Sequence, residues 1–166
     1  MKPIFAPWRM EYITSCKRPG CVFCELPQHG VSEESLILCL NEHAYVVLNR
    51  YPYVSGHLMV IPYRHVEDPL ELTSQEWRAL NDLVRPVLLA LKDEYRPHGF
   101  NVGMNLGVAA GAGIHEHIHI HVIPRWTGDN NLISVLADTR VIPEGLLQTW
   151  TRLRPRFETL CLQAKE

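Results

Sequence analysis

The chain has 166 residues, a length that suits one domain with its own hydrophobic core. Hydrophobic residues make up 46% and charged residues 20%, and the net charge of -2 excludes the strongly basic surface of a general nucleic-acid-binding protein. No apolar run approaches the roughly 20 residues of a membrane helix, and the first residues lack the apolar core of a secretory signal. We therefore expect a single cytoplasmic domain over residues 1–166 that has neither a membrane nor a nucleic acid as a partner.

The first part of the chain predicts an irregular segment followed by three strands. Residues 1–30 lack a periodic pattern and contain the cysteine pair Cys21 and Cys24. Strands are expected at 35–40 and 43–49, on either side of a short polar turn, and at 57–62, where a proline ends the third strand. The segment 51–56 contains proline and glycine and is expected to form a loop.

One long helix is expected in the middle of the chain. Thr73 and Glu76 have the spacing of a capping box. Apolar residues follow at helical spacing: Leu80, Leu83, Val84, Val87, Leu88 and Leu91. Pro86 is expected to bend this helix, and Pro97 with Gly99 to end it.

The last part of the chain predicts two more strands and a C-terminal helix. Strands are expected at 100–106 and 116–124, on either side of a glycine-rich loop at 107–113. A helical tail is expected within 141–166, disturbed at Pro155. This order of elements predicts an α+β fold with a mainly antiparallel sheet of about five strands, a long central helix and a C-terminal helix.

Nine of the residues are histidines, and four of these lie between positions 115 and 121. Residues two apart on a strand point to the same face, so His117, His119 and His121 are expected on one face and the apolar residues between them on the other. Three interpretations are open: a polar strand face, a row of metal ligands, or a nucleophile with flanking helper groups. A neutral imidazole attacks phosphorus well near neutral pH and is also a good leaving group, which favours a nucleotidyl-transferring site.

The glycine-rich loop at 107–113 comes immediately before this run. Its small residues leave room for backbone amides to surround an anion, and a phosphate site needs such donors where charge develops. A plain hairpin loop is the alternative. The direct connection to the histidine strand favours phosphate binding.

The histidine run resembles the motif of the histidine triad family. The segment His117-Ile-His119-Ile-His121-Val-Ile alternates histidine with hydrophobic residues and ends in two hydrophobics, and Pro124-Arg125 follows. The segment 49–57, Asn-Arg-Tyr-Pro-Tyr-Val-Ser-Gly-His, resembles the nucleotide-binding segment of the fragile histidine triad branch. The similarity covers nearly the whole chain. Within that branch, the segments 7–10, 49–63 and 124–129 resemble bacterial diadenosine tetraphosphate phosphorylases.

The resemblance implies a division of roles among the site residues. His119 would attack the α-phosphorus and carry the nucleotidyl group, His121 would contact the α-phosphate and move protons, and His117 would support the site. The resemblance further implies contacts to the ribose, the phosphates and the other histidines from Asn49, His57, Asn105, Gly111 and Gly113. Water or inorganic phosphate would then release the nucleotide, and the family pattern also implies a homodimer.

Two residues after the run have open roles. Arg125 is expected either to neutralise the charge of a polyphosphate or to pair with a carboxylate. Trp126 is expected either to stack on a nucleobase or to pack beside a turn.

Two positions leave the acceptor undecided. Gly113 stands where the fragile histidine triad hydrolases carry a glutamine, and the missing side chain leaves space for phosphate as a second anion. Ile120 stands where the phosphorylases carry a polar residue, which argues against phosphorolysis. We therefore predict cleavage of a dinucleoside polyphosphate, of the diadenosine tetraphosphate type, at its α-phosphorus, by water or phosphate. The alternatives are a nucleoside phosphoramidate or adenylate hydrolase, a non-catalytic nucleotide-binding regulatory protein and a zinc-stabilised interaction module.

The cysteine pair Cys21-Val-Phe-Cys24 has two interpretations. Buried thiols pack as small hydrophobic groups, whereas a structural zinc site uses four ligands. Some histidine triad proteins, and the related galactose-1-phosphate uridylyltransferases, bind zinc through two such cysteines and two histidines. The matching positions here are His65 and His117. The resemblance thus implies a structural zinc ion held by Cys21, Cys24, His65 and His117, and no organic cofactor.

Overall fold

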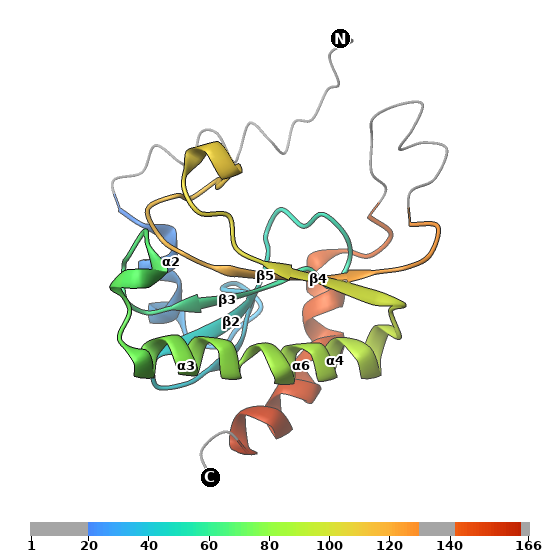
Figure 1. Cartoon of the computed structure of the whole chain (residues 1–166). Coiled ribbons are helices and arrows are strands. Elements are labelled where there is room, and N and C mark those ends of the chain that lie inside the picture. Colours follow the sequence, from blue (N-terminus) through green and yellow to red (C-terminus); the bar gives the residue numbers. More distant parts are fainter. Residues whose placement is uncertain (1–19, 130–141, 164–166) are drawn as a thin grey trace.

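The computed structural model describes residues 20–129 and 142–163, with side chains up to residue 159. It has an α+β fold in which five antiparallel strands form one sheet (Figure 1). The strands are β1 (Ile37–Leu40), β2 (Ala44–Leu48), β3 (Leu58–Pro62), β4 (Gly99–Gly103) and β5 (Ile120–Arg125). The helices are α2 (Val22–Glu25), α3 (Ser74–Asp82), α4 (Val84–Tyr95) and α6 (Leu146–Gln163), and short 3-10 turns lie at η1 (Leu26–His29), η2 (Pro69–Glu71) and η3 (Val108–Ala110).

The strand order in the sheet is β1-β2-β3-β5-β4. The first three strands follow one another, and the chain then passes through α3 and α4 to reach β4 at the far edge. It returns as β5, which lies between β3 and β4. His121 of β5 is flanked by Met59 on one side and Gly103 on the other. The strand β5 is the last in the sequence but an interior strand of the sheet, and it contains His121.

The fifth strand begins later than the sequence predicts. It was expected at 116–124 and runs from Ile120 to Arg125, so His117 and His119 precede it. The register pairs Val60 with Ile120, and continuing it would bring residue 118 opposite Pro62. Proline has no N–H to donate to a ladder, and the N–H of Ile118 bonds instead to the Val66 carbonyl at 2.9 Å. The two histidines therefore lie in a segment held outside the ladder.

The expected long helix consists of two consecutive helices, α3 and α4, which meet at Leu83. Pro86 lacks an N–H, so the helical hydrogen bond to the residue four positions earlier is missing. The capping box is confirmed: the N–H of Glu76 donates to Thr73 Oγ1 at 3.2 Å, and the N–H of Thr73 donates to the Glu76 carboxylate at 2.7 Å. The helix ends at Tyr95, before Pro97 as predicted.

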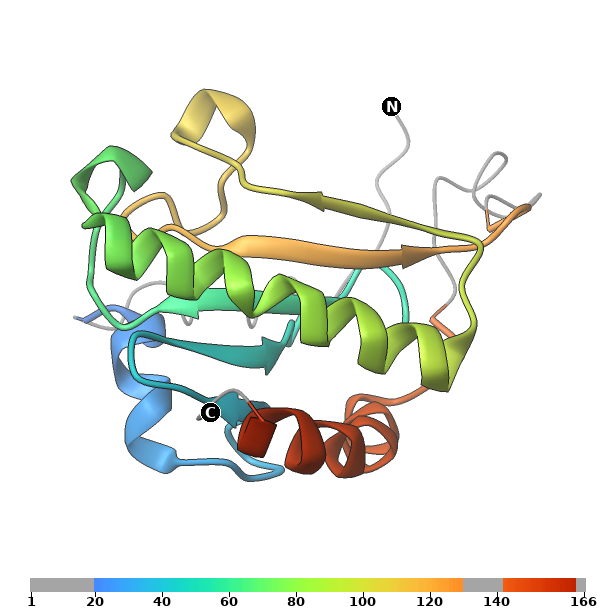
Figure 2. The same cartoon turned by 60° about the horizontal axis from the view of Figure 1, so that its bottom comes forward.

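The two helices cross one face of the sheet (Figure 2). Residues of β5 alternate accordingly: Ile120 and Val122 are buried, and Ile120 lines a hollow together with Val84 and Leu88 of α4. His121 is only partly buried and belongs to the opposite set of positions. His121 thus lies on the sheet face opposite α4.

Helix α6 closes the other edge of the sheet. The indole N–H of Trp150 donates to the carbonyl of Ile37 at 3.0 Å, and the Arg154 guanidinium donates to the carbonyl of Leu38 at 3.2 Å. These bonds satisfy carbonyls of β1 that a bare edge strand would expose. Pro155 lies inside this helix, at the position where the sequence predicts a disturbance.

Residues 20–30 are more regular than the expected irregular segment. The carbonyl of Cys21 accepts the N–H groups of Cys24 and Glu25, which form the single turn of α2. One turn is too short to show a periodic pattern in the sequence. The hydroxyl of Tyr45 donates to the carbonyl of Phe23 at 2.7 Å and ties this turn to β2. The expected motif at 7–10 lies outside the described residues, and within them no helix is both long and apolar enough to cross a membrane.

Candidate active site and metal centre

The tautomer of His119 is fixed by the backbone. This residue is 6% exposed, and its Nδ1 lies 2.9 Å from the carbonyl oxygen of His117. A carbonyl only accepts, so Nδ1 carries the proton and Nε2 carries the free lone pair. Burial lowers the pKa of His119 below its ordinary value of 6.5. The imidazole is therefore neutral at pH 7 and presents a nucleophilic nitrogen.

His121 is held in the complementary tautomer through His57. The backbone N–H of Tyr53 donates to Nδ1 of His57 at 3.2 Å, so this nitrogen is an acceptor. The proton of His57 is therefore on Nε2, which lies 2.9 Å from Nδ1 of His121. The Nδ1 of His121 accepts this bond, and its own proton is on Nε2. His121 thus offers an N–H donor beside the lone pair of His119.

Burial keeps both supporting histidines neutral. The pKa of His57 is lowered to about 3, chiefly by burial and then by the neighbouring His121 and His119. The pKa of His121 is lowered to about 4, again mainly by burial. Protonation of His57 would remove the acceptor that fixes the tautomer, so the low pKa preserves this arrangement at neutral pH.

Asn49 and His57, the first and last residues of the expected nucleotide-binding segment, lie close to His121. His57 is fully buried, so its connection with the site runs through His121 and involves no exposed surface of its own. Asn49 is half-buried, with its side-chain nitrogen 3.3 Å from Nδ1 of His57. Its side-chain oxygen accepts the N–H of Tyr51 at 3.0 Å. Asn49 therefore shapes the loop that fixes His57.

Two aromatic side chains that the sequence analysis did not select border the histidines. The ring of Phe23 lies 5.1 Å from that of His119, and the ring of His119 lies 4.7 Å from that of His121. Tyr53, 45% exposed, lies 4.7 Å from His57 and 6.2 Å from His121, measured between ring centroids. The only sequence signals were an apolar residue between two cysteines and an aromatic residue in the segment 49–57.

The glycine-rich loop is exposed and forms the short turn η3. The N–H groups of Ala110 and Gly111 bond to carbonyls within the loop, so these two amides do not point at an anion. Gly111 has a φ of 83°, a left-handed conformation that favours glycine. Asn105 is half-buried and Gly113 is exposed. The loop comes just before the histidines in the chain, and its phosphate contacts remain a prediction.

Arg125 and Trp126 lie at the other end of β5. Arg125 makes a two-pronged ion pair with Asp129 and donates to the side chain of Asn101 at 2.9 Å. The hydrogen bond to Asp129 raises the pKa of Arg125. At about 3.3 Å per residue, Arg125 begins roughly 13 Å from His121 along the strand. The structure thus shows the carboxylate pairing that was one of the two expectations, and Trp126 begins the turn that Asp129 closes.

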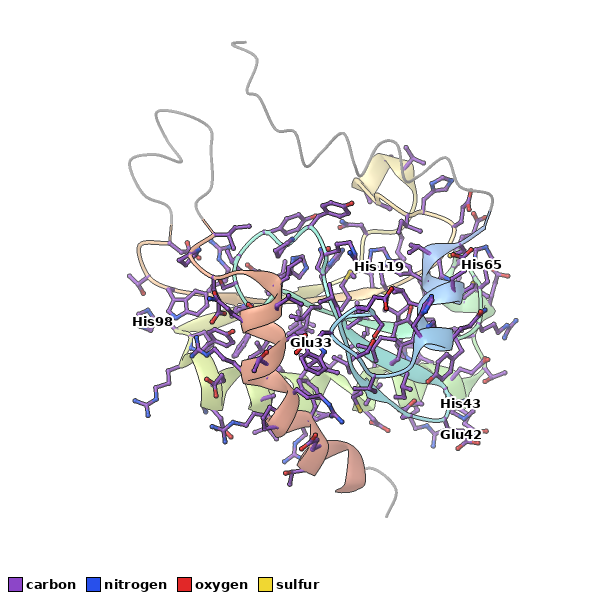
Figure 3. All side chains as sticks on the ribbon, turned by 180° about the vertical axis from the view of Figure 1, so that it is seen from behind. Glu33, Glu42, His43, His65, His98 and His119 are labelled. Atoms are coloured by element: carbon purple, nitrogen blue, oxygen red, sulfur yellow. The ribbon has the colours of Figure 1, made fainter. Side chains whose placement is uncertain are left out.

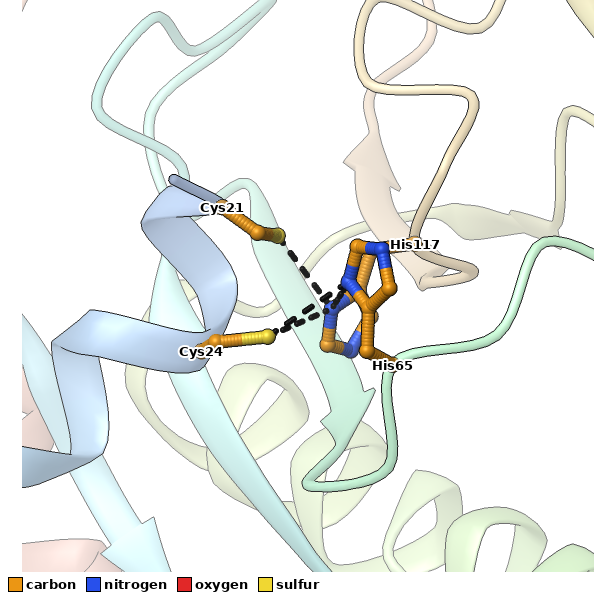
Figure 4. A group of neighbouring side chains, drawn as sticks. All are labelled: Cys21, Cys24, His65 and His117. Atoms are coloured by element: carbon orange, nitrogen blue, oxygen red, sulfur yellow. Dashed lines mark hydrogen bonds between the residues drawn. The ribbon is translucent and has the colours of Figure 1, made fainter. Parts of the chain in front are cut away.

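The four expected metal ligands lie together (Figure 4). Nδ1 of His117 is 3.4 Å from Sγ of Cys21, 3.6 Å from Sγ of Cys24 and 3.3 Å from Nδ1 of His65, and Sγ of Cys24 is 3.5 Å from Nδ1 of His65. A tetrahedral zinc with bonds of about 2.3 Å to sulfur and about 2.05 Å to nitrogen separates its ligands by roughly 3.3–3.8 Å. These four distances fit such an ion, and all four ligand atoms lie within 4.8 Å of one another.

The protonation pattern of the cluster also suits a cation. Nε2 of His117 donates to the carbonyl of Pro62 at 2.9 Å, which leaves a lone pair on Nδ1 toward the cluster. Cys21 and Cys24 are free thiols. The pKa of Cys24 is raised to about 11, chiefly because burial disfavours a thiolate and secondly because a thiolate there would be repelled by Cys21. A metal ion would remove that repulsion and favour both thiolates.

His65 lies beside α2 at the same end of the sheet as His119, whereas His98 lies at the opposite end (Figure 3). His117 thus faces the cysteines, whereas the rings of His119 and His121 lie beside each other. The run that was expected as one row of imidazoles is divided between two sites.

Comparison with known proteins agrees with this geometry. The HIT domain profile matches residues 31–128. The chain belongs to the histidine triad (HIT) family. A Mycobacterium tuberculosis protein named AP-4-A phosphorylase is 40% identical over 158 residues, which cover 90% of this chain and 80% of that protein. Together these similarities identify the chain as a HIT-family nucleotide enzyme.

Two solved structures share the fold of this HIT-family chain. A zinc-bound histidine triad family protein from Mycobacterium smegmatis superposes with a TM-score of 0.68 at 25% identity, covering 89% of this chain and 98% of that one. A hypothetical histidine triad nucleotide-binding protein from Sulfolobus tokodaii gives 0.67 at 29% identity, covering 84% and 93%. The predicted HIT-like fold is therefore confirmed.

Proposed function

We propose that this HIT-family enzyme cleaves dinucleoside polyphosphates at the α-phosphorus through a nucleotidyl adduct on Nε2 of His119. The observation that carries the proposal is the 2.9 Å bond between Nδ1 of His119 and the carbonyl of His117. That bond places the proton of a neutral, buried imidazole on Nδ1 and leaves the lone pair on Nε2. When Nε2 bonds to phosphorus the ring becomes cationic, and the same carbonyl then accepts a stronger, charge-assisted bond.

His121 supplies the proton movement in this proposal. Its Nε2–H donates to an oxygen of the α-phosphate or of the departing nucleotide as the bond to phosphorus breaks. The acceptor that later attacks the adduct loses its own proton to the same nitrogen. His121 thus begins and ends the cycle in one tautomer, and His57 holds it there.

We propose inorganic phosphate as the acceptor. The support is the 40% identity with a protein named AP-4-A phosphorylase. Diadenosine tetraphosphate would then give ATP when His119 attacks, and phosphate attack on the adenylyl adduct would give ADP. The glycine at position 113, exposed and without a side chain, is compatible with a second anion.

We propose zinc as the ion held by Cys21, Cys24, His65 and His117. The ligand distances support it, and so does the similarity to a zinc-bound family member. All four positions are occupied by protein atoms, so the ion would be structural and would leave no open position for substrate. The ion would tie α2 to the chain segment that follows β3 and to the one that precedes β5.

We further propose a homodimer that forms along β4. This strand is an edge of the sheet, and Val102 is 47% exposed on it. The hollow beside it is lined by apolar side chains of α4 and by Met104. Light scattering should give twice the mass of the chain, and Val102→Arg should return the protein to a monomer. A monomeric wild-type protein would contradict this part of the proposal.

Product analysis tests the reaction. Diadenosine tetraphosphate should give ADP and ATP only when inorganic phosphate is present. AMP and ATP in the absence of phosphate would show hydrolysis instead. The variant His119→Ala should lose the activity, and wild-type rates in that variant on every nucleotide tested would show that the nucleophile is wrongly assigned.

A further inference from the structure

Phe23 joins the cysteine pair to the proposed nucleophile. It lies between Cys21 and Cys24 in the sequence and is 5% exposed. Its ring meets that of His117 edge-on at 5.6 Å and that of His119 at 5.1 Å. One side chain therefore contacts both a metal ligand and the proposed nucleophile.

Two rings border the imidazole of His119. The ring centroid of Phe23 lies 5.1 Å away, and that of His121, nearly perpendicular to His119, lies 4.7 Å away. The hydrogen bond from Nδ1 to the His117 carbonyl fixes one atom of the ring but leaves rotation about that bond open. The terminal torsion of a histidine side chain is broad. Ring contacts must therefore set the direction of Nε2.

Phe23 is itself anchored from both ends. Its neighbours Cys21 and Cys24 belong to the metal-ligand cluster, and its carbonyl accepts the hydroxyl of the buried Tyr45 at 2.7 Å. The cluster also holds His117, whose carbonyl receives the Nδ1–H of His119. Two separate routes, one through Phe23 and one through the His117 backbone, thus lead from the metal-ligand cluster to the same imidazole.

We propose that Phe23 is a positioning residue that holds His119 in line for attack, and that the metal-ligand cluster acts on the reaction through it. The proposal rests on the assignment of His119 as nucleophile. Phe23 is buried and contacts the ring of His119. Its loss should therefore lower kcat and leave KM nearly unchanged. A misplacement of about 1 Å in a reacting group is enough to cost on the order of 100-fold in rate.

The kinetic experiment compares Phe23→Ala and Phe23→Leu with two controls in the metal-loaded protein. Phe23→Ala should lower kcat roughly 10- to 100-fold, and Phe23→Leu, which restores most of the bulk, should recover part of that loss. Val22→Ala changes the exposed neighbour. Leu153→Ala opens a cavity in the core at α6 and lowers the Tm comparably. Both controls should keep kcat within about twofold, below the effect expected of a displaced group.

A second measurement needs no substrate. The Nδ1–H proton of His119 should give a sharp imidazole NMR signal in the wild-type protein, and this signal should broaden or disappear in Phe23→Ala but persist in Leu153→Ala. Removing the metal with a chelator should broaden it in the same way, and restoring zinc should recover it. Metal removal and Phe23→Ala should be less than additive in their effects, because the contact of Phe23 with His119 is one of the two routes from the metal-ligand cluster to the imidazole.

The proposal is overturned if Phe23→Ala keeps both the wild-type kcat and the His119 signal, or if Leu153→Ala lowers kcat equally. If His119→Ala retains activity, the proposed nucleophile is wrong. The NMR comparison still decides independently whether Phe23 restrains His119.

Discussion

Replacing His57 with leucine tests whether His121 must be held in one tautomer. The substitution fills the same buried space with an apolar side chain. It removes the Nδ1 acceptor that receives the N–H of Tyr53, and it removes the Nε2–H that donates to His121. Because His57 is fully buried, any effect on catalysis must reach the substrate through His121.

The size of the effect follows from these two lost bonds. A buried donor left without an acceptor costs about 1–3 kcal/mol. In a chain of this length each kcal/mol lowers the Tm by roughly 2–4 °C, so the Tm should fall by about 2–12 °C. If the bond to His121 contributes about 1–3 kcal/mol to the transition state, kcat should fall roughly 5- to 150-fold. KM should change little.

The control for activity is His98→Leu, at an exposed histidine away from the proposed site. The Nδ1 of His98 also accepts a backbone N–H, that of Thr127 at 2.9 Å, but His98 lies at the opposite end of the sheet from His119 (Figure 3). Steady-state kinetics with diadenosine tetraphosphate and thermal unfolding should be measured on both variants. The reasoning fails if His57→Leu keeps the wild-type kcat, or if His98→Leu loses as much activity.

Three further predictions concern stability. Cys21→Ser should lower both the zinc content, measured by metal analysis, and the Tm; if the wild-type protein purifies without zinc and the variant is equally stable, the zinc assignment is wrong. The pKa of His57 lies near 3, below its ordinary 6.5, so the unfolded chain binds a proton that the folded chain does not, and stability should be lost as pH falls from 6.5 toward 3. At ~1.36 kcal/mol per pH unit, this loss is about 2 kcal/mol at pH 5. Urea unfolding at pH 7 and pH 5 should show a smaller drop in the free energy of unfolding for His57→Leu than for the wild-type protein. An equal drop in the two proteins would contradict this prediction. Glu76→Ala should cost about 0.5–2 kcal/mol in urea unfolding by removing half of the capping box, and exposed Gln75→Ala, one residue away, should cost clearly less.

The sequence was informative where the structure depends on neighbouring residues. The capping box at Thr73 needs only a spacing of three residues, and the structure confirms both of its bonds. The alternation of Ile120 and Val122 with histidine predicted which side of β5 is buried. The start of β5 was misjudged because it depends on Pro62, a residue of another strand that becomes its neighbour only through the register of the sheet.

The candidate site shows the same division between local and distant information. The resemblance named the four residues Cys21, Cys24, His65 and His117, and the structure brings them together. It did not indicate Phe23, because nothing in a Cys-x-x-Cys spacing says what the intervening side chains touch. Nor did it indicate the tautomers, which depend on backbone carbonyls and amides that every residue has.

The tautomers nevertheless explain why neighbouring histidines behave differently. His117 and His119 each give a proton to a carbonyl, but they do so through opposite nitrogens, Nε2 and Nδ1. The free lone pair is therefore on Nδ1 of His117, toward the cysteines, and on Nε2 of His119. Since the carbonyl that orients His119 belongs to His117, moving His117 to suit a metal also moves the acceptor of the nucleophile. A change in the metal-ligand cluster should thus reach the proposed reaction even though no ligand atom faces the substrate.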